Sequence, residues 1–212
     1  MLVLASASPR RRDLLTQAGY TFEVIPAEVC EDVRPAEQPI PYVLRLAREK
    51  AEAVAQGQEL LALAAGAADS AMVLGADTTV VAPNGEILGK PENDADAARM
   101  LRLLSGATHQ VITGVALAAG GATEVAAEVT HVTFAWMSDE EIAGYIASGE
   151  PQGKAGAYAI QGRAARWIPR IHGCYFNVVG LPLALAGSMI NAAQQRVAVE
   201  AAAQSILFAR GA

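Results

Sequence analysis

The first fifteen residues, MLVLASASPRRRDLL, constrain how the chain begins to fold. Residues 1–4 are apolar and predict a buried strand, and Ser8 followed by Pro9 predicts the N-cap and the first residue of a helix. Three arginines at positions 10–12 then fall in the first turn of this helix. Cations there oppose the helix dipole and cost roughly a few tenths of a kcal/mol each, so a helix selected only for stability would carry acids instead.

A bound polyanion would remove this penalty. The free N–H groups of the helix start, the hydroxyls of Ser6 and Ser8, and the three guanidinium groups can converge on one phosphate. A solvated basic turn is the alternative, and an isolated S-P-R-R string favours it. The complete pattern, from apolar strand through hydroxyl-rich loop to basic helix start, favours a phosphate site.

Composition limits the class of protein. Hydrophobic residues make up 52% of the 212 residues and charged residues 18%, which is typical of a globular chain, and the length suits one domain over residues 1–212. The net charge of −6 at pH 7 argues against nucleic acid or an anionic membrane as a partner. No apolar run reaches the roughly 18 to 20 residues of a membrane span, and no signal peptide is recognisable. Cys30 and Cys174 have no metal-ligand spacing, so we expect a reducing, cytoplasmic environment.

Hydrophobic periodicity and turn signals predict an α/β protein. Helices are expected over residues 41–56, 94–104, 139–149 and most of 181–212. Strands are expected over residues 72–81, 109–118, 124–136, 167–171 and 175–180, in addition to the first. A Gly-Gly turn should make the strands over 109–118 and 124–136 an antiparallel hairpin. The Ala- and Gly-rich residues 57–71 and the Gly-rich residues 153–162 are expected to be loops.

Asp77 is an acid inside the apolar strand LGADTTVV. Burying a carboxylate there is costly unless it meets a cation, a metal ion or hydrogen-bond donors. A local turn capped by the aspartate is the alternative, but acids within strands are rare, and the catalytic interpretation of Asp77 is the stronger one.

Three lysines are further candidates. Lys90 lies just after the turn that follows the strand of Asp77, and Pro91 extends the chain beyond it, so Lys90 can reach the same pocket. Lys50 lies on a helix rich in charge, where a solvated face with i,i+4 ion pairs is at least as good an interpretation. Lys154, in the Gly-rich loop, is equally ambiguous.

Two more polar residues have weaker signals. Glu31, in EVCEDVRP, offers the hard oxygen that Mg²⁺ prefers, although the segment by itself favours a simple polar loop. Gln161 carries both a donor and an acceptor, which suits the edge of a nucleobase, but a glutamine beside a glycine is common.

Eight segments taken together resemble the Maf family of nucleoside triphosphate pyrophosphatases, in order from residue 2 to about residue 185. They are LASASPRRRDLL, RLAREKA, LGADTTVV, ILGKP, LRLLSGATHQVITGVAL, GYIASGEP, KAGAYAIQG and YFNVVGLPL. The resemblance implies an elongated, strongly twisted mixed sheet flanked by helices, with two lobes around a cleft. It also implies a relationship to the inosine triphosphate pyrophosphatases and a homodimer.

The activity implied is hydrolysis of a nucleoside triphosphate to the monophosphate and pyrophosphate. Asp77 matches the family's proton acceptor, and its substrate-specificity positions are matched by Arg10, Thr78 and Gln161. Other polar residues of its cleft are matched by Ser8, Arg11, Glu31, Lys50 and Lys90. Mg²⁺ or Mn²⁺ would be held by the carboxylates of Glu31 and Asp77 together with phosphate.

The form AGAYAIQG around Gln161 is similar to the branch of the family that acts on dTTP and UTP. A role in clearing the nucleotide pool, with a link to septum formation, would follow from the resemblance. The alternatives are a non-catalytic nucleotide-binding regulator of cell division, against which the intact Asp77 argues, and a pyrophosphatase for purine or modified nucleotides.

Overall fold

The computed structural model describes residues 1–63 and 71–210, with residues 61–63, 198 and 200–210 described by their backbone alone. One mixed sheet of seven strands forms its centre. The strands are β1 (Leu2–Leu4), β2 (Glu23–Val24), β3 (Met72–Val81), β4 (Ile87–Leu88), β5 (Thr108–Ala119), β6 (Ala122–Thr133) and β7 (Arg170–His172). The α-helices are α1 (Pro9–Gln17), α2 (Pro39–Ala55), α3 (Gln58–Leu63), α4 (Asp94–Leu104), α5 (Asp139–Ile146), α6 (Tyr175–Val179) and α7 (Leu183–Arg210).

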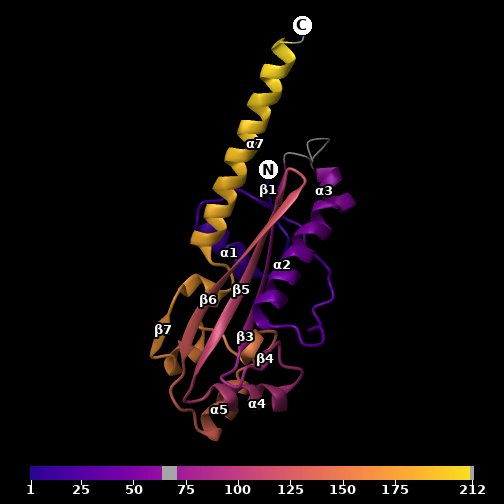
Figure 1. The fold of residues 1–212 in the computed structure, drawn as a ribbon. Coiled ribbons are helices and arrows are strands. Elements are labelled where there is room, and N and C mark those ends of the chain that lie inside the picture. The colour runs from indigo at the N-terminus through magenta and orange to yellow at the C-terminus, as the bar shows by residue number, and fades with distance from the viewer. Residues whose placement is uncertain (64–70, 211–212) are drawn as a thin grey trace.

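The sheet is parallel at one edge and antiparallel through its other half. Its order is β2-β1-β3-β5-β6-β7, and β4 pairs with the end of β3. β1 runs parallel to β2 and β3, whereas β3, β5, β6 and β7 are successively antiparallel. β5 and β6 form a long twisted hairpin along the molecule (Figure 1). The elongated mixed sheet flanked by helices that was predicted for this chain is confirmed.

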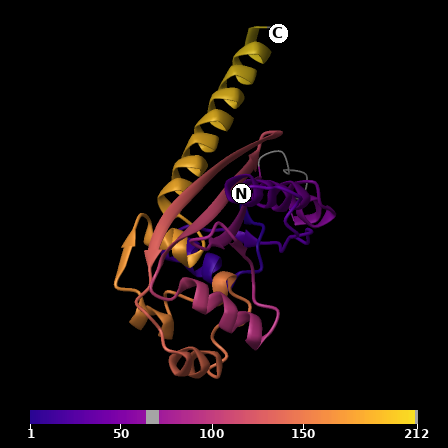
Figure 2. The ribbon, with the colours of Figure 1, turned by 60° about the horizontal axis from the view of Figure 1, so that its bottom comes forward.

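Helices cover both faces of this hairpin. Alternate residues of β5 point to opposite sides, so Leu117 packs with Met189 of α7 while Ala116 packs with Ala51 of α2. Figures 1 and 2 accordingly show α7 and α2 on opposite sides of the hairpin. α7 continues beyond the end of the sheet in both views. Among the described helices, none is long and apolar enough to cross a membrane.

Two glycines let α2 lie directly on the sheet. Gly75 of β3 and Gly114 of β5 face α2, and a Cβ at these positions would collide with the backbone of Ala47 and Val43. Glycine is required at both because backbone meets backbone there. The close approach brings Lys50 of α2 against β3 beside Asp77, and it therefore determines the geometry of the site.

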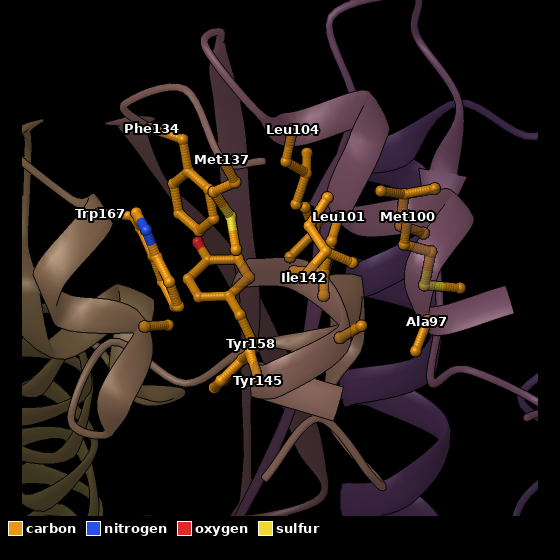
Figure 3. Packing of buried hydrophobic residues seen from close by; sticks show 14 of the residues in the cluster. Ala97, Met100, Leu101, Leu104, Phe134, Met137, Ile142, Tyr145, Tyr158 and Trp167 are labelled. Atoms are coloured by element: carbon orange, nitrogen blue, oxygen red, sulfur yellow. The ribbon is translucent and has the colours of Figure 1, made fainter. Parts of the chain in front are cut away.

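A separate hydrophobic cluster forms the lobe that contains α4 and α5. It is the most aromatic part of the protein and gathers Phe134, Tyr145, Tyr158 and Trp167 between the sheet and these helices. Figure 3 shows Tyr158 and Trp167 close to Phe134, with Leu101 and Leu104 of α4 further along the same core. The Gly-rich residues 153–162 pass over this cluster, which therefore supports them from below.

Most of the predicted elements are confirmed, including the capped start of α1, where Ser8 accepts a hydrogen bond from the N–H of Arg11. Several predicted elements or boundaries are wrong. Residues 58–63 form α3 rather than a loop, since QELLAL consists of strong helix formers, while residues 64–70 lie outside the described part. β6 ends at Thr133, before the predicted 136, and α5 ends at Ile146, before the predicted 149.

A further error is the predicted strand over residues 175–180, which is the short helix α6 followed by Gly180. The helix turns Asn177 inward, where its amide donates to the Val111 carbonyl and to the Thr130 hydroxyl. The β-branched residues of YFNVVG suggested a strand, but this buried polar contact decides the conformation. The predicted strand over 167–171 is confirmed only at its end, as β7.

Candidate active site

A cleft of about 560 Å³ lies between the aromatic lobe and the rest of the sheet. This volume is in the range of sites that bind small molecules. Its walls are formed by the β1–α1 turn, α2, β3, the segment after β4, the Gly-rich loop and the end of α6. All nine residues matched by resemblance to the family's site line it: Ser8, Arg10, Arg11, Glu31, Lys50, Asp77, Thr78, Lys90 and Gln161.

Arg11 holds one wall of the cleft together from within. Its side chain is buried and donates from Nε to the Gly180 carbonyl (2.8 Å), from Nη1 to the Ser6 hydroxyl (3.1 Å) and from Nη2 to the Thr78 hydroxyl (3.0 Å). Burial lowers the pKa of the guanidinium, an effect that the negative charge of Asp77 partly offsets. Because Nε, Nη1 and Nη2 all donate to protein oxygens, Arg11 ties the walls of the cleft to one another.

The neighbouring arginines are placed differently. Arg10 is half-buried at the cleft, where Nε donates to the Val179 carbonyl at 3.3 Å. Arg12 is exposed and forms a 3.9 Å ion pair with Asp13, outside the cleft lining. The three consecutive arginines therefore have three different environments, and the predicted convergence of all three guanidinium groups on one phosphate is wrong. Arg10 is the arginine whose cation can meet a ligand in the cleft.

A lysine between two carboxylates forms the charged centre of the cleft. The Nζ of Lys50 lies 2.6 Å from Oε1 of Glu31 and 2.7 Å from Oδ1 of Asp77. Lys50 and Asp77 are only 6% and 7% exposed, so these charges interact where water screens them little. The solvated helix face that was equally plausible for Lys50 is thus wrong, because Gly75 brings α2 onto the strand of Asp77.

Lys90 extends this cluster toward solvent. Its exposed ammonium lies 3.1 Å from Oε2 of Glu31, so the predicted reach of Lys90 into the pocket is confirmed. Burial alone would raise the pKa of Glu31, but the hydrogen bonds and charges of Lys50 and Lys90 outweigh it and lower that pKa. Glu31 therefore stays ionised and bridges two cations.

Tyr42 contributes to the cleft although nothing in the sequence singled it out. Its hydroxyl donates to the Glu31 carbonyl at 2.8 Å and so fixes the loop that carries this acid. Burial and the negative charges of Asp77 and Glu31 raise the pKa of Tyr42 to about 12, which keeps the phenol neutral. A tyrosine near the start of an amphipathic helix looks like an ordinary core residue, so its role is visible only in three dimensions.

The Gly-rich loop forms another part of the cleft wall, and the N–H of its Gly156 donates to the Gly89 carbonyl beside Lys90. Gln161 is exposed there, with its amide available to a ligand, while Tyr158 is buried beneath it. Lys154 donates to the Glu150 carbonyl at 2.5 Å, and burial together with the charge of Arg10 lowers its pKa. The sequence left open whether Lys154 reaches the pocket, and the structure places it in the cleft lining.

Glu31 and Asp77 are the carboxylates that can serve a metal ion in this cleft. Both meet at the Lys50 ammonium, so the site already stabilises positive charge between them. Within the described residues, no group of three or more His, Cys, Asp or Glu could hold a metal ion by itself. Two hard oxygen donors fit Mg²⁺ or Mn²⁺, because Mg²⁺ is commonly bound by one or two carboxylates plus substrate phosphates.

Fold and cleft together define an α/β protein with a site for a phosphorylated small molecule. Residues 1–193 match the family model described as Maf-like protein. The chain is 51% identical over 192 residues to a dTTP/UTP pyrophosphatase of Koribacter versatilis (strain Ellin345), covering 91% of this chain and 94% of that protein. The same description belongs to a Salmonella typhimurium protein (53% identity, 86% and 87% covered) and to one from Pelotomaculum thermopropionicum (50%, 90% and 95%).

The chain therefore belongs to the family of Maf-like proteins. The resemblance that the eight sequence segments suggested is confirmed over all but the last part of the chain. That last part is the distal portion of α7, which continues to Arg210.

Proposed function

We propose that this protein hydrolyses nucleoside triphosphates, preferentially dTTP and UTP, to the monophosphate and pyrophosphate. The observation that carries the proposal is the buried Asp77, held by Lys50 in the same cleft as the arginine-flanked β1–α1 turn. A carboxylate and several cations in one cleft can activate water and neutralise phosphate oxygens together. The names of the curated relatives support the same reaction and the same two substrates.

In this proposal, Asp77 is the proton acceptor for the attacking water. A bond forms between the water oxygen and the α-phosphorus, the bond from the α-phosphorus to the bridging oxygen breaks, and pyrophosphate leaves. The proton removed from water goes to the Asp77 carboxylate, which Lys50 orients through Oδ1. Arg10 and Lys90 lie where their charges can meet phosphate oxygens, and Ser8 adds a hydroxyl at the helix start.

Glu31 and Asp77, aided by the phosphates, would hold Mg²⁺ or Mn²⁺. When bound, such an ion would offset the negative charge of the triphosphate and of the departing pyrophosphate. Lys50 already occupies the space between the two carboxylates, so Lys50 and the ion would share them.

Gln161 would select the base. Its exposed side chain lines the cleft, where its amide can pair with the edge of a pyrimidine. A base with the wrong donor or acceptor would leave a buried polar group unpaired, which allows strong discrimination. Thr78, matched by resemblance to a specificity position, has a hydroxyl bonded to Arg11 and Thr113 and would act through them.

The position of attack provides the test. Hydrolysis of UTP in ¹⁸O-water should place the label in UMP and leave the pyrophosphate unlabelled, and omission of Mg²⁺ and Mn²⁺ with EDTA present should abolish product. UDP with labelled phosphate would instead mean attack at the γ-phosphorus and would contradict the proposal. Tight UTP binding without any hydrolysis would favour the regulator alternative.

The resemblance to the Maf family also leads us to propose a homodimer that works in the cytoplasm. Light scattering during size exclusion should then give twice the 22.0 kDa mass of one chain. A mass of one chain at micromolar concentration would contradict the dimer and leave the proposed reaction unaffected.

A further inference from the structure

A buried histidine lies directly under the Gly-rich loop. His109, at the start of β5, is 2% exposed, and its Nε2 lies 2.8 Å from the hydroxyl of Tyr158. The two rings and Phe134 form a mutually edge-on group, with ring centroids 4.9 to 5.5 Å apart. Figure 3 shows Tyr158 packed against Phe134 in the same cluster. His109 is thus a polar residue within an aromatic core.

His109 has two ring nitrogens, and among the described residues only one of them has a hydrogen-bond partner. Burial lowers the pKa of His109 to about 4, so at neutral pH the imidazole is uncharged and carries one N–H. Its Nδ1 is buried and has no hydrogen-bond partner among the described residues. A phenylalanine would fill the space without that cost, so the contact with Tyr158 is the feature that distinguishes histidine here.

The loop that receives this contact has a strained backbone. Gly156 and Ala157 both have left-handed conformations, with φ of 67° and 60°. For alanine this conformation is unfavourable, and it persists only where the surroundings impose it. Gly156 allows the loop to lie against Val80 of β3, because a Cβ there would be 2.9 to 3.0 Å from that side chain. Tyr158 follows immediately, so its ring and hydroxyl are in a position to impose the strained turn.

Other contacts secure the far side of the same loop. The Glu150 carboxylate accepts from the N–H of Arg163, and the Tyr145 hydroxyl lies 3.3 Å from Glu150 and accepts from the N–H of Ala159. The Tyr158–His109 bond joins the loop to β5 instead. β5 pairs with β3 through Asp77, whose register partner is Gly114. The bond therefore connects the loop of Gln161 with the strands that carry the proposed catalytic acid.

We propose that His109 is a positioning residue that, through Tyr158, sets the place of Gln161 in the cleft and thereby the choice of base. It touches no substrate itself. The positioning role rests on the proposed function and adds to it a residue that determines specificity from beneath the site. Loss of the bond should reduce the discrimination between UTP and CTP, while the Asp77–Lys50 ion pair stays intact.

The test compares the variants His109→Phe and Tyr158→Phe, each of which removes the bond from one side. Each should lower the ratio of kcat/KM for UTP over CTP by about ten-fold, because a bond of about 1.4 kcal/mol corresponds to that factor. The loss should come from a higher KM for UTP, with kcat within three-fold of the unchanged protein. The double variant should be no worse than either single variant, since both remove the same bond. His109→Gln, which retains a side-chain donor, should recover part of the ratio.

Phe134→Leu is the matched control, because it loosens the same aromatic cluster without removing a hydrogen bond. It should lower Tm and leave the UTP-to-CTP ratio unchanged. If His109→Phe and Tyr158→Phe lower Tm but keep the ratio within two-fold, His109 is structural only and the positioning role is wrong.

Binding of α,β-methylene UTP and CTP, which cannot be cleaved between these phosphates, separates the two proposals. A UTP preference in binding that both variants lose supports the positioning role even if the enzyme proves inactive, an outcome that would contradict only the proposed reaction. Equal binding of both analogues by the unchanged protein would overturn the positioning role and the base selection assigned to Gln161, and would leave the proposed hydrolysis unaffected.

Discussion

Two parts of the cleft wall are held by different interactions. One is the part around Arg11, Lys50 and Asp77 that we propose binds phosphate, here called the phosphate end, and the other is the Gly-rich loop that we propose binds the base, here called the base end. At the phosphate end, buried charges are paired across short distances, with Lys50 between Glu31 and Asp77. At the base end, packed aromatic rings support a glycine-rich loop, with Tyr158 as the link between them. One end is thus organised by electrostatics and the other by shape.

This difference has a functional consequence. A paired buried charge fixes the protonation and orientation of the groups that act on phosphate, so changes there should reduce turnover. A packed aromatic cluster fixes where a loop lies, so changes there should alter which nucleotide is accepted and how stable the protein is. Substitutions at the two ends should therefore have separable effects.

The largest effect is expected from Asp77→Asn. Removing the proton acceptor should lower kcat by about 10² to 10⁴, the range typical of a general base, while UTP binding and the far-ultraviolet circular dichroism spectrum persist. Asp139→Asn is the control, since that acid is exposed and pairs with Arg102 outside the cleft. Turnover within ten-fold of the unchanged protein would remove Asp77 from the base role.

The buried His109 beneath the Gly-rich loop should make the free energy of unfolding depend on pH. The unfolded histidine takes up a proton below about pH 6.5, whereas the buried one resists protonation down to about pH 4. The free energy of unfolding is therefore unaffected by His109 above about pH 6.5. It falls by about 2 to 3 kcal/mol as the pH drops from there toward about pH 4. Urea unfolding of the unchanged protein and of His109→Phe at pH 7, 5.5 and 4.5 measures this. The variant should lose less stability on acidification, and equal losses in both proteins would be inconsistent with a buried neutral His109.

Arg11→Lys and Arg12→Lys should separate the structural arginine from its neighbour. Lysine at position 11 keeps the charge but cannot reproduce the three-way fork to Ser6, Thr78 and Gly180. We expect a loss of about 1 to 3 kcal/mol in unfolding free energy, together with a raised KM. The exposed Arg12 should tolerate the same change within about 0.5 kcal/mol. Equal effects in the two variants would show that burial of Arg11 does not organise the phosphate end.

The smallest effect is expected from Gln161→Glu. The side chain is exposed, so unfolding free energy should stay the same, but loss of the amide donor should change the relative kcat/KM of UTP and CTP by about ten-fold. Steady-state kinetics with both nucleotides measures it, and Gln194→Glu, exposed on α7 and outside the cleft lining, is the control. Unchanged selectivity would reject the assignment of base reading to Gln161.

The sequence predicts the phosphate end well because charge in an apolar context is physically conspicuous. An aspartate within a buried strand must be compensated, and a serine, a proline and arginines in one helix start point to an anion. What the pattern leaves open is which charges are buried. Lys50 looked as suited to solvent as to the cleft, and the deciding fact, a glycine on a neighbouring strand, lies 25 residues away at Gly75.

The base end is much less predictable. Tyr158, Phe134 and His109 are spread over 50 residues, and in a sequence each of them looks like ordinary core or strand material. Their relation comes from tertiary packing, which no local pattern carries. The same limit explains the error at residues 175–180, where the buried contacts of Asn177 override the strand preference of its neighbours.

The most direct test of the whole account is release of pyrophosphate from a panel of nucleoside triphosphates, with Mg²⁺ or Mn²⁺ and with an EDTA control. The account predicts metal-dependent release that is highest for dTTP and UTP. Preference for a purine would contradict the proposed base end, and no pyrophosphate from any nucleotide would contradict the proposed reaction itself.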